Sequence, residues 1–165
     1  DPAGLRVAQD AAEAFMKLDA AGREHGTAFV SRGDNSGTHI IEKNVWKKAG
    51  IAPAGAWYKE AGQGMEQVII MADGLSGYAL CDRATWLATQ KNLGLGLLME
   101  GDPALLNIYH VIRVNPDKFP KVNAAGAKSF SDFMVEPATQ KVIGQFGVDK
   151  FGQPLFFPDA GKPES

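Results

Sequence analysis

The sequence has little of several features that usually reveal a function. It contains a single cysteine, Cys81, which excludes an internal disulfide framework and any metal site built from several cysteines. Its three histidines, His25, His39 and His110, lie far apart and form no HxxxH or HExxH pattern, so we expect no zinc site. No apolar run approaches the ~20 residues that a membrane-spanning helix needs, so no membrane insertion is expected.

A strong charge of either sign is also missing. The 165 residues include 17 Lys and Arg against 19 Asp and Glu, which gives a formal net charge of −2, and no block of basic residues stands out. The sequence therefore lacks the excess or cluster of basic residues that is typical of proteins that bind nucleic acid or anionic membranes. A small anion held by a local site remains compatible with this charge. With 45% hydrophobic and 22% charged residues, the chain has the composition of an ordinary globular protein.

The order of apolar patterns predicts an α/β chain, because helical and strand-like segments alternate. The predicted helices cover residues 4–21, 40–49, 65–72, 83–91, 123–135 and 136–146, and the predicted strands cover 27–30, 77–81, 93–99 and 108–114. Ser36 and Asp82 are predicted as helix caps, and Pro137 suits a first helical position. The tail at residues 151–158 is too apolar to float freely and is predicted to pack against other residues.

The most informative segment is SRGDNSGTH at residues 31–39, between a predicted strand and a predicted helix. Ser36 is a good N-cap residue, which leaves Gly37, Thr38 and His39 as the first helical turn. The backbone N–H groups of that turn have no acceptors within the helix. The turn carries no Asp or Glu to match the positive end of the helix dipole, so its donors need other partners.

Two interpretations of this loop stay open. Glycines let a ligand approach the backbone, and Arg32 lies four residues before the cap, so the loop can form an anion-binding site. Alternatively, Asp34 and Ser36 cap the helix while Arg32 pairs with Asp34 on the surface.

Several longer motifs carry a resemblance to a known family. They are residues 29–34 (FVSRGD) with 36–39 (SGTH), residues 57–65 (WYKEAGQGM), the pair Asp82-Arg83, and residues 152–160 (GQPLFFPDA). Together they resemble the tungstate-binding proteins of ABC uptake systems, which are solute-binding proteins of the type II periplasmic fold. The similarity runs from the first residues to the tail. One departure is Asn35, where the family more often has Asp.

The resemblance implies an α/β, type II periplasmic-binding-protein-like fold, of which this chain holds one lobe plus the returning part of the other. Residues 1–105 would form the second, ligand-binding lobe, and residues 106–165 would form the returning C-terminal part of the first lobe. Members of the family have an earlier segment with a Thr/Ser-rich oxyanion motif at another helix N-terminus. The expectation is that this chain lacks that segment and that its site is incomplete.

The implied ligand is a small oxyanion, tungstate or molybdate, with no further cofactor and no bound metal ion. These dianions are fully deprotonated at neutral pH, so their oxygens only accept hydrogen bonds and the site must offer donors. The resemblance assigns Arg32 and Thr38 as ligand residues, and the local pattern adds backbone N–H groups and the Ser36 hydroxyl. The candidate ligand-binding residues are Arg32, Ser36, Gly37, Thr38, Ser31, Gly64 and Met65. In this fold a second helix of the same lobe also points its N-terminus at the ligand, and Gly64 and Met65 occupy that position here.

The family further implies a periplasmic or extracellular receptor that partners the membrane subunits of an ABC transporter. Two alternatives belong to other classes. One is a ligand-sensing module of a transcription regulator, since such modules share the fold. The other is a small hydrolase in which Asp34, Ser36 and His39 act as orienter, nucleophile and base. Three residues within six positions would struggle to form the necessary chain of hydrogen bonds, so we expect a binding protein and no catalytic residues.

Overall fold

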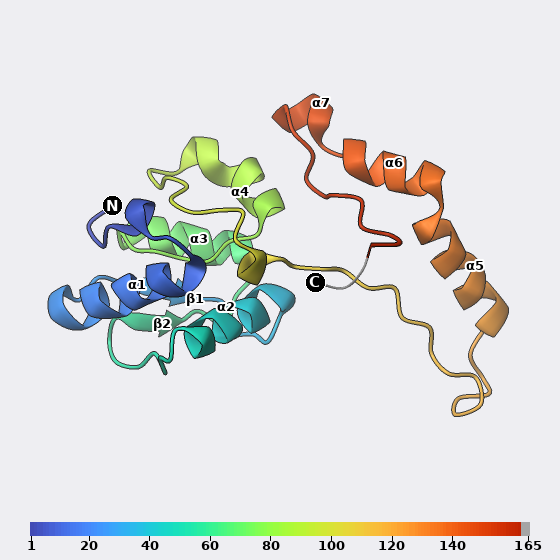
Figure 1. Ribbon diagram of the computed structural model, residues 1–165, viewed down its shortest axis with the longest axis horizontal. Helices are drawn as coiled ribbons and strands as arrows, with labels where there is room; N and C mark the ends of the chain where they lie inside the picture. The colour runs from blue at the N-terminus through green and yellow to red at the C-terminus, as the bar shows by residue number, and fades with distance from the viewer. Residues whose placement is uncertain (163–165) are drawn as a thin grey trace. The chain divides into compact units, whose positions relative to one another are not determined.

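The computed structural model describes residues 1–162, so the last three residues of the segment predicted as 106–165 lie outside the described residues. The chain forms two compact units, the first Asp1–Asn107 and the second beginning at Ile108. Their elements can be followed along the colour bar of Figure 1. No helix in the described part of the chain is both long and apolar enough to cross a membrane.

The first unit is built around two parallel strands, β1 (Phe29–Ser31) and β2 (Tyr58–Glu60), with Phe29 opposite Tyr58. Its helices are α1 (Ala11–His25), α2 (Gly37–Lys48), α3 (Met65–Gly74) and α4 (Arg83–Thr89), with 3-10 turns η1 (Leu5–Val7), η2 (Gln90–Asn92) and η3 (Pro103–Leu105). Phe29 packs in one cluster with residues of α1 and α2, whereas Val30 packs in another with residues of α3. Because successive strand residues face opposite sides, the helices cover both faces of the sheet.

An aromatic cluster fills the face between the sheet and the helices α1 and α2. The Trp46 ring lies 4.4 Å from the Phe15 ring, 5.4 Å from the Phe29 ring and 6.0 Å from the Trp57 ring, measured between centroids. Gly22 on α1 lies directly against Trp57, since a Cβ placed on Gly22 would be 2.3 Å from the indole ring. This packing anchors α2, and with it the loop that precedes α2.

Predictions that rest on local chemistry are confirmed. Ser36 caps α2, and Asp82 caps α4 by accepting the Thr85 N–H at 2.8 Å. The helices predicted near the C-terminus are α5 (Ala124–Val135) and α6 (Pro137–Gln145), with Pro137 at the first helical position. The helix predicted over 65–72 is α3.

The single helix predicted over residues 4–21 is wrong. The chain forms η1 and then breaks, because Asp10 adopts an extended conformation and caps α1 by accepting the Glu13 N–H. Asp102 accepts the Ala11 N–H at 2.7 Å from 91 positions away, so the helix start is fixed by a residue distant in sequence. From there α1 continues to His25.

Of the four predicted strands, one is shifted and the other three are wrong. The strand predicted over 27–30 is shifted to Phe29–Ser31, and 77–81 provides only a bridge between Tyr78 and Phe29. The segments predicted as strands over 93–99 and 108–114 contain no strand. A strand needs a neighbour to pair with, and among the described residues β1 and β2 pair with each other and with Tyr78 but with neither segment.

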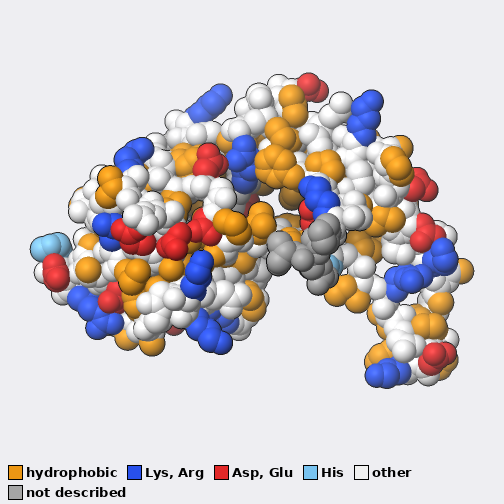
Figure 2. Space-filling model, viewed as in Figure 1, with side chains coloured by type: hydrophobic (Ala, Val, Ile, Leu, Met, Phe, Trp, Pro, Cys, Tyr) orange, Lys and Arg blue, Asp and Glu red, His pale blue; other side chains and the backbone are white. Residues whose placement is uncertain are grey.

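The second unit contains α5, α6 and the short α7 (Val148–Phe151). Its tail packs as predicted: the Leu155 N–H donates to the Phe146 carbonyl at 2.9 Å, and the Phe156 ring lies 6.2 Å from the Phe146 ring. None of its described residues is buried. Figure 2 shows many apolar side chains on the surface in view, and Phe130, Phe133 and Val142 of this unit are more than half exposed.

Candidate functional site

The starts of α2 and α3 are reached from the same edge of the sheet. Parallel strands end at one edge, and the loops beyond that edge are where ligands bind in open α/β sheets. Two hydrogen bonds tie these loops together: the Ala61 N–H donates to the Ser31 carbonyl at 2.9 Å and the Gly62 N–H to the Arg32 carbonyl at 2.8 Å. The loop before α3 therefore runs alongside the loop before α2.

The first turn of α2 retains unmatched donors. The Ser36 Oγ accepts the His39 N–H at 3.4 Å, as an N-cap does. Among the described residues no hydrogen bond engages the backbone N–H groups of Gly37 and Thr38 or the Thr38 hydroxyl. Gly37 is exposed, whereas Thr38 is 8% exposed. Within residues 1–162, the positive end of α2 therefore keeps two backbone donors without an acceptor, and such donors suit an anion.

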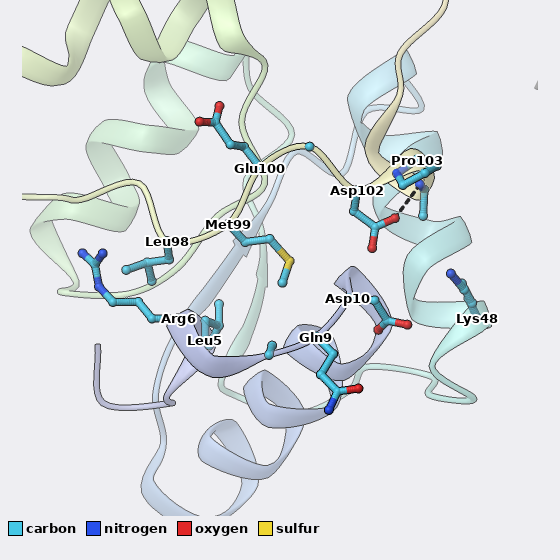
Figure 3. Close-up of a pocket in the computed structure, with 13 residues that line it drawn as sticks. Leu5, Arg6, Gln9, Asp10, Lys48, Leu98, Met99, Glu100, Asp102 and Pro103 are labelled. Atoms are coloured by element: carbon cyan, nitrogen blue, oxygen red, sulfur yellow. Dashed lines mark hydrogen bonds between the residues drawn. The ribbon is translucent and has the colours of Figure 1, made fainter.

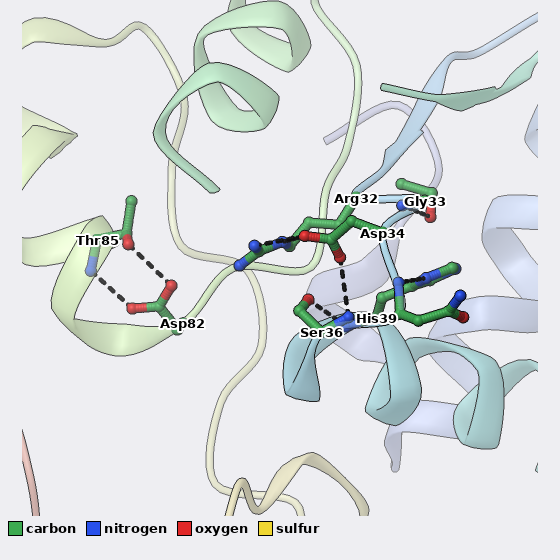
Figure 4. Close-up of polar contacts among 9 residues, drawn as sticks. Arg32, Gly33, Asp34, Ser36, His39, Asp82 and Thr85 are labelled. Atoms are coloured by element: carbon green, nitrogen blue, oxygen red, sulfur yellow. Dashed lines mark hydrogen bonds and ion pairs between the residues drawn. The ribbon is translucent and has the colours of Figure 1, made fainter. Parts of the chain in front are cut away.

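Arg32 forms the ion pair that the alternative interpretation of the loop required. Its Nε and Nη2 donate to Asp34 Oδ2 at 3.0 and 2.6 Å, and the Ser36 N–H donates to Asp34 Oδ1 at 3.0 Å (Figure 4). Partial burial opposes ionisation of Asp34, but the hydrogen bonds from Ser36 and the Arg32 charge outweigh it and lower its pKa to about 2. Asp34 therefore joins Arg32 to the Ser36 backbone while leaving the Gly37 and Thr38 N–H groups unmatched.

The Arg32 guanidinium also points toward the start of α4 (Figure 4). Burial and then the charge of Asp82 raise the pKa of the Cys81 thiol to about 12, and the charge of Arg32 opposes that shift. In Figure 4 the guanidinium extends from Asp34 in the direction of Asp82, whose carboxylate accepts from the Thr85 backbone and hydroxyl. A guanidinium has five N–H donors, and Asp34 engages two of them.

The arrangement of His39 does not support the hydrolase interpretation. His39 is 5% exposed, and its Nδ1 accepts the Asn35 N–H at 2.9 Å, so the imidazole holds Asn35 in its left-handed conformation (φ 58°). Within the described residues no hydrogen bond joins the His39 ring to the Ser36 hydroxyl or to Asp34. A nucleophile needs a base within hydrogen-bond reach, and that contact is lacking here.

The other predicted ligand residues differ in their surroundings. Ser31 is fully buried, and its hydroxyl donates to Glu42 Oε2 at 2.8 Å. Gly64 caps α3 without a side-chain hydrogen bond, Met65 follows as a buried side chain, and the first turn contains Glu66. The acidic residue complements the α3 dipole, so this helix start is less favourable to an anion than that of α2.

Glu42 is the residue that sequence reasoning missed. It is 2% exposed, and its Oε1 accepts hydrogen bonds from the Tyr58 hydroxyl at 2.7 Å and from Trp46 Nε1 at 3.2 Å. Burial, followed by the Glu42 carboxylate, raises the pKa of Tyr58 well above its usual range. One signal is present in the sequence: Glu42 lies at helical spacing from Val45 and Trp46, on the side of α2 that is buried.

A separate concave region lies away from these loops. Figure 3 shows it between the N-terminal segment and residues 98–104. Its volume is about 660 Å³. Lys48, at the other end of α2 from Ser36, contributes to its lining. Asp102 in its wall has a lowered pKa because the backbone N–H groups of Ala11 and Ala104 donate to it. Its charged groups are of both signs, and two of its carboxylates, Asp10 and Asp102, serve helix starts, so we do not place the site there.

Comparison with known proteins identifies the class. Residues 1–138 match the PBP superfamily domain, and the chain therefore belongs to the PBP (periplasmic-binding-protein) superfamily. The predicted α/β fold class is confirmed.

The particular relatives share one ligand in their names. The chain is 42% identical over 164 residues to the tungstate-binding protein TupA of Peptoclostridium acidaminophilum, covering 98% of this chain and 56% of that protein. It is 37% identical over 137 residues to TupA of Campylobacter jejuni, covering 80% and 50%. The resemblance to tungstate-binding proteins is therefore confirmed. The chain spans about half the length of the curated relatives that it matches.

Solved structures agree with these relatives. The tungstate binding protein TupA from Desulfovibrio alaskensis G20 gives a TM-score of 0.74 at 40% identity, covering 97% of this chain and 64% of that one. The crystal structure of the tungstate ABC transporter from Geobacter sulfurreducens gives a TM-score of 0.71 at 40% identity, covering 88% of this chain and 60% of that one.

Proposed function

We propose that this chain binds a tetrahedral oxyanion, tungstate or molybdate, as part of the solute receptor of an ABC importer. It would act in the periplasm or outside the cell, with the importer's membrane subunits as partners and without catalysis. The observation that carries the proposal is the first turn of α2, where the Gly37 and Thr38 N–H groups have no acceptor among the described residues. The names of the relatives point to the same ligand class.

Arg32, Thr38 and Gly37 are the central ligand residues of this proposal, through the guanidinium, the threonine hydroxyl and two backbone N–H groups. The Ser36 hydroxyl is a secondary candidate: its oxygen accepts the His39 N–H, and its hydrogen bond to Asp34 would have to be exchanged for one to the anion. The backbone N–H groups of Gly64 and Met65 are secondary candidates, since Glu66 follows them. Ser31 is left out because its hydroxyl hydrogen is already donated to Glu42.

We also propose that residues 1–105 are the ligand-binding lobe and that residues 106–165 are a returning part of the other lobe. The division of the chain after Asn107 supports this assignment. About four charge-assisted hydrogen bonds from this chain would supply roughly 6–12 kcal/mol, at roughly 1.5–3 kcal/mol each. Association costs at least ~4 kcal/mol, so the expected dissociation constant of this chain is about micromolar at best.

Calorimetric titration of the 165-residue chain with tungstate, molybdate, sulfate and phosphate tests the proposal. Tungstate and molybdate should bind more tightly than sulfate and phosphate. Thr38→Val removes one hydroxyl donor, which should weaken tungstate binding about 10- to 150-fold, for about 1.5–3 kcal/mol.

Thr89→Val is the matched control, since the Thr89 hydroxyl only donates to the Thr85 carbonyl within α4. Equal affinity of wild type, Thr38→Val and Thr89→Val for tungstate would remove α2 from the site. An absence of heat with all four anions at millimolar concentration would contradict oxyanion binding by this chain.

A further inference from the structure

A carboxylate lies inside the first unit directly beneath the proposed site. Glu42 is 2% exposed and accepts three hydrogen bonds, from the Ser31 hydroxyl at 2.8 Å, the Tyr58 hydroxyl at 2.7 Å and Trp46 Nε1 at 3.2 Å. All three partners donate to the carboxylate oxygens, two to Oε1 and one to Oε2. The three donors come from β1, β2 and α2, so one side chain ties these three elements together.

The connection continues into the ligand loop. Ser31 Oγ donates to Glu42 and accepts the Gly33 N–H at 3.3 Å, on either side of Arg32. Gly33 has φ 64°, and a Cβ there would lie 2.9 Å from the Glu60 side chain. The backbone conformation next to Arg32 therefore requires glycine and is closely packed against Glu60. Glu42 thus holds the backbone on both sides of the proposed ligand residue.

Glu42 is present despite two opposing effects. A buried charge is less favourable than a well-packed apolar side chain unless its hydrogen bonds compensate. A negative charge behind an anion site also disfavours the anion. Both effects favour an uncharged residue at position 42, so a role in holding the loop accounts for the carboxylate.

We propose that Glu42 is a positioning residue of the oxyanion site: through Ser31 it holds the loop so that Arg32 and the first turn of α2 bind the same anion. This inference rests on the proposed function. Glu42 touches no ligand; it acts through the Ser31 hydroxyl.

Glu42→Gln separates positioning from charge by the sign of its effect. The substitution keeps the size of the side chain, removes the negative charge and turns a donor toward Ser31. Loss of the charge alone would tighten tungstate binding, whereas loss of positioning weakens it. We expect at least a tenfold weaker affinity by calorimetry of the 165-residue chain. Unchanged or tighter binding would overturn the proposal.

Tyr58→Phe is the matched control. It deletes a donor that reaches the same carboxylate from β2, and it leaves the hydrogen bond between the Ser31 hydroxyl and Glu42 Oε2 in place. It should lower thermal stability and change tungstate affinity less than threefold. If Tyr58→Phe and Glu42→Gln weaken binding equally, Glu42 has a general structural role and the proposal fails.

Ser31→Ala distinguishes positioning from direct contact and provides a second variant if Glu42→Gln does not fold. Positioning predicts that Ser31→Ala weakens binding at least fivefold and that the double variant with Glu42→Gln is no weaker than Glu42→Gln alone. Additive losses would mean that Ser31 contacts the anion independently of Glu42, which contradicts the proposed route.

A ligand-free measurement keeps this inference separate from the proposed function. Amide hydrogen exchange at Gly33 should be at least tenfold faster in Glu42→Gln or Ser31→Ala than in wild type, while exchange in α3 stays unchanged. If wild type binds none of the anions, the proposed function fails, and this exchange result still decides whether Glu42 holds the loop. An unchanged Gly33 rate would refute it.

Discussion

Replacing Arg32 with alanine should nearly abolish oxyanion binding. The structure sets the size of the effect, because Asp34 engages two of the five guanidinium N–H groups and leaves three for a ligand. An oxyanion that receives two of these would lose about 3–6 kcal/mol in Arg32→Ala, at roughly 1.5–3 kcal/mol per charge-assisted bond. The affinity for tungstate should therefore fall about 10²- to 10⁴-fold.

The direction in which a second substitution changes the affinity for tungstate tests the same reasoning. Asp34 competes with the anion for the guanidinium and adds a negative charge beside it. Asp34→Asn removes the charge and weakens the competition, since a neutral amide oxygen is a poorer acceptor than a carboxylate, so it should strengthen tungstate binding at least threefold while Arg32→Ala weakens it. Opposite signs at two residues in direct contact are difficult to produce by general loss of structure.

The assay is titration calorimetry with tungstate at low ionic strength, since salt screens exposed charges. Arg23→Ala is the matched control: Arg23 forms the same kind of pair with Asp19, with Nε 2.7 and 2.8 Å from the carboxylate oxygens, on α1. Its affinity should equal that of wild type. A loss below fivefold in Arg32→Ala, or an equal loss in Arg23→Ala, would refute the role of Arg32.

Three further predictions concern stability. Gly22→Ala should destabilise the fold by about 1–3 kcal/mol in urea unfolding, because its Cβ would meet the Trp57 ring, whereas Gly74→Ala has open space and should stabilise it by about 0.5–1 kcal/mol. Equal effects would contradict the packing described. The pKa of Asp34 is lowered from 3.8 to about 2, so its ionised form stabilises the folded state above about pH 4, and this contribution is lost as the pH falls toward 2. Asp34→Asn should therefore differ from wild type in unfolding free energy more at about pH 6 than at about pH 2.5, and a constant difference would refute the linkage. Amides in residues 108–162 should exchange at least about tenfold faster than those of α1, because none of the described residues there is buried; equal protection would contradict this.

Local chemistry explains what could be predicted from the sequence. Ser36, Asp82 and Pro137 act on the backbone within a few residues, so the starts of α2, α4 and α6 could be predicted from the sequence. The open first turn of α2 followed from the same logic, since no acidic residue stands in that turn.

Distant partners explain what could not be predicted. The start of α1 depends on Asp102, and a segment such as 108–114 becomes a strand only beside another strand. The role of Glu42 could not be predicted because two of its three donors, Ser31 and Tyr58, lie on the strands β1 and β2. The Arg32–Asp34 pair was predicted only as an alternative, and the structure shows that it coexists with N–H groups at Gly37 and Thr38 that have no acceptor within residues 1–162.

The most direct test of the central claim is the position of tungsten in a crystal of this chain grown with tungstate. Tungsten scatters anomalously, so a difference map locates it independently of the protein atoms. The account predicts one strong peak whose surrounding oxygens lie within hydrogen-bond distance of the Gly37 and Thr38 backbone nitrogens and of the Arg32 guanidinium. A strong peak at any other place, with the first turn of α2 unoccupied, would contradict it.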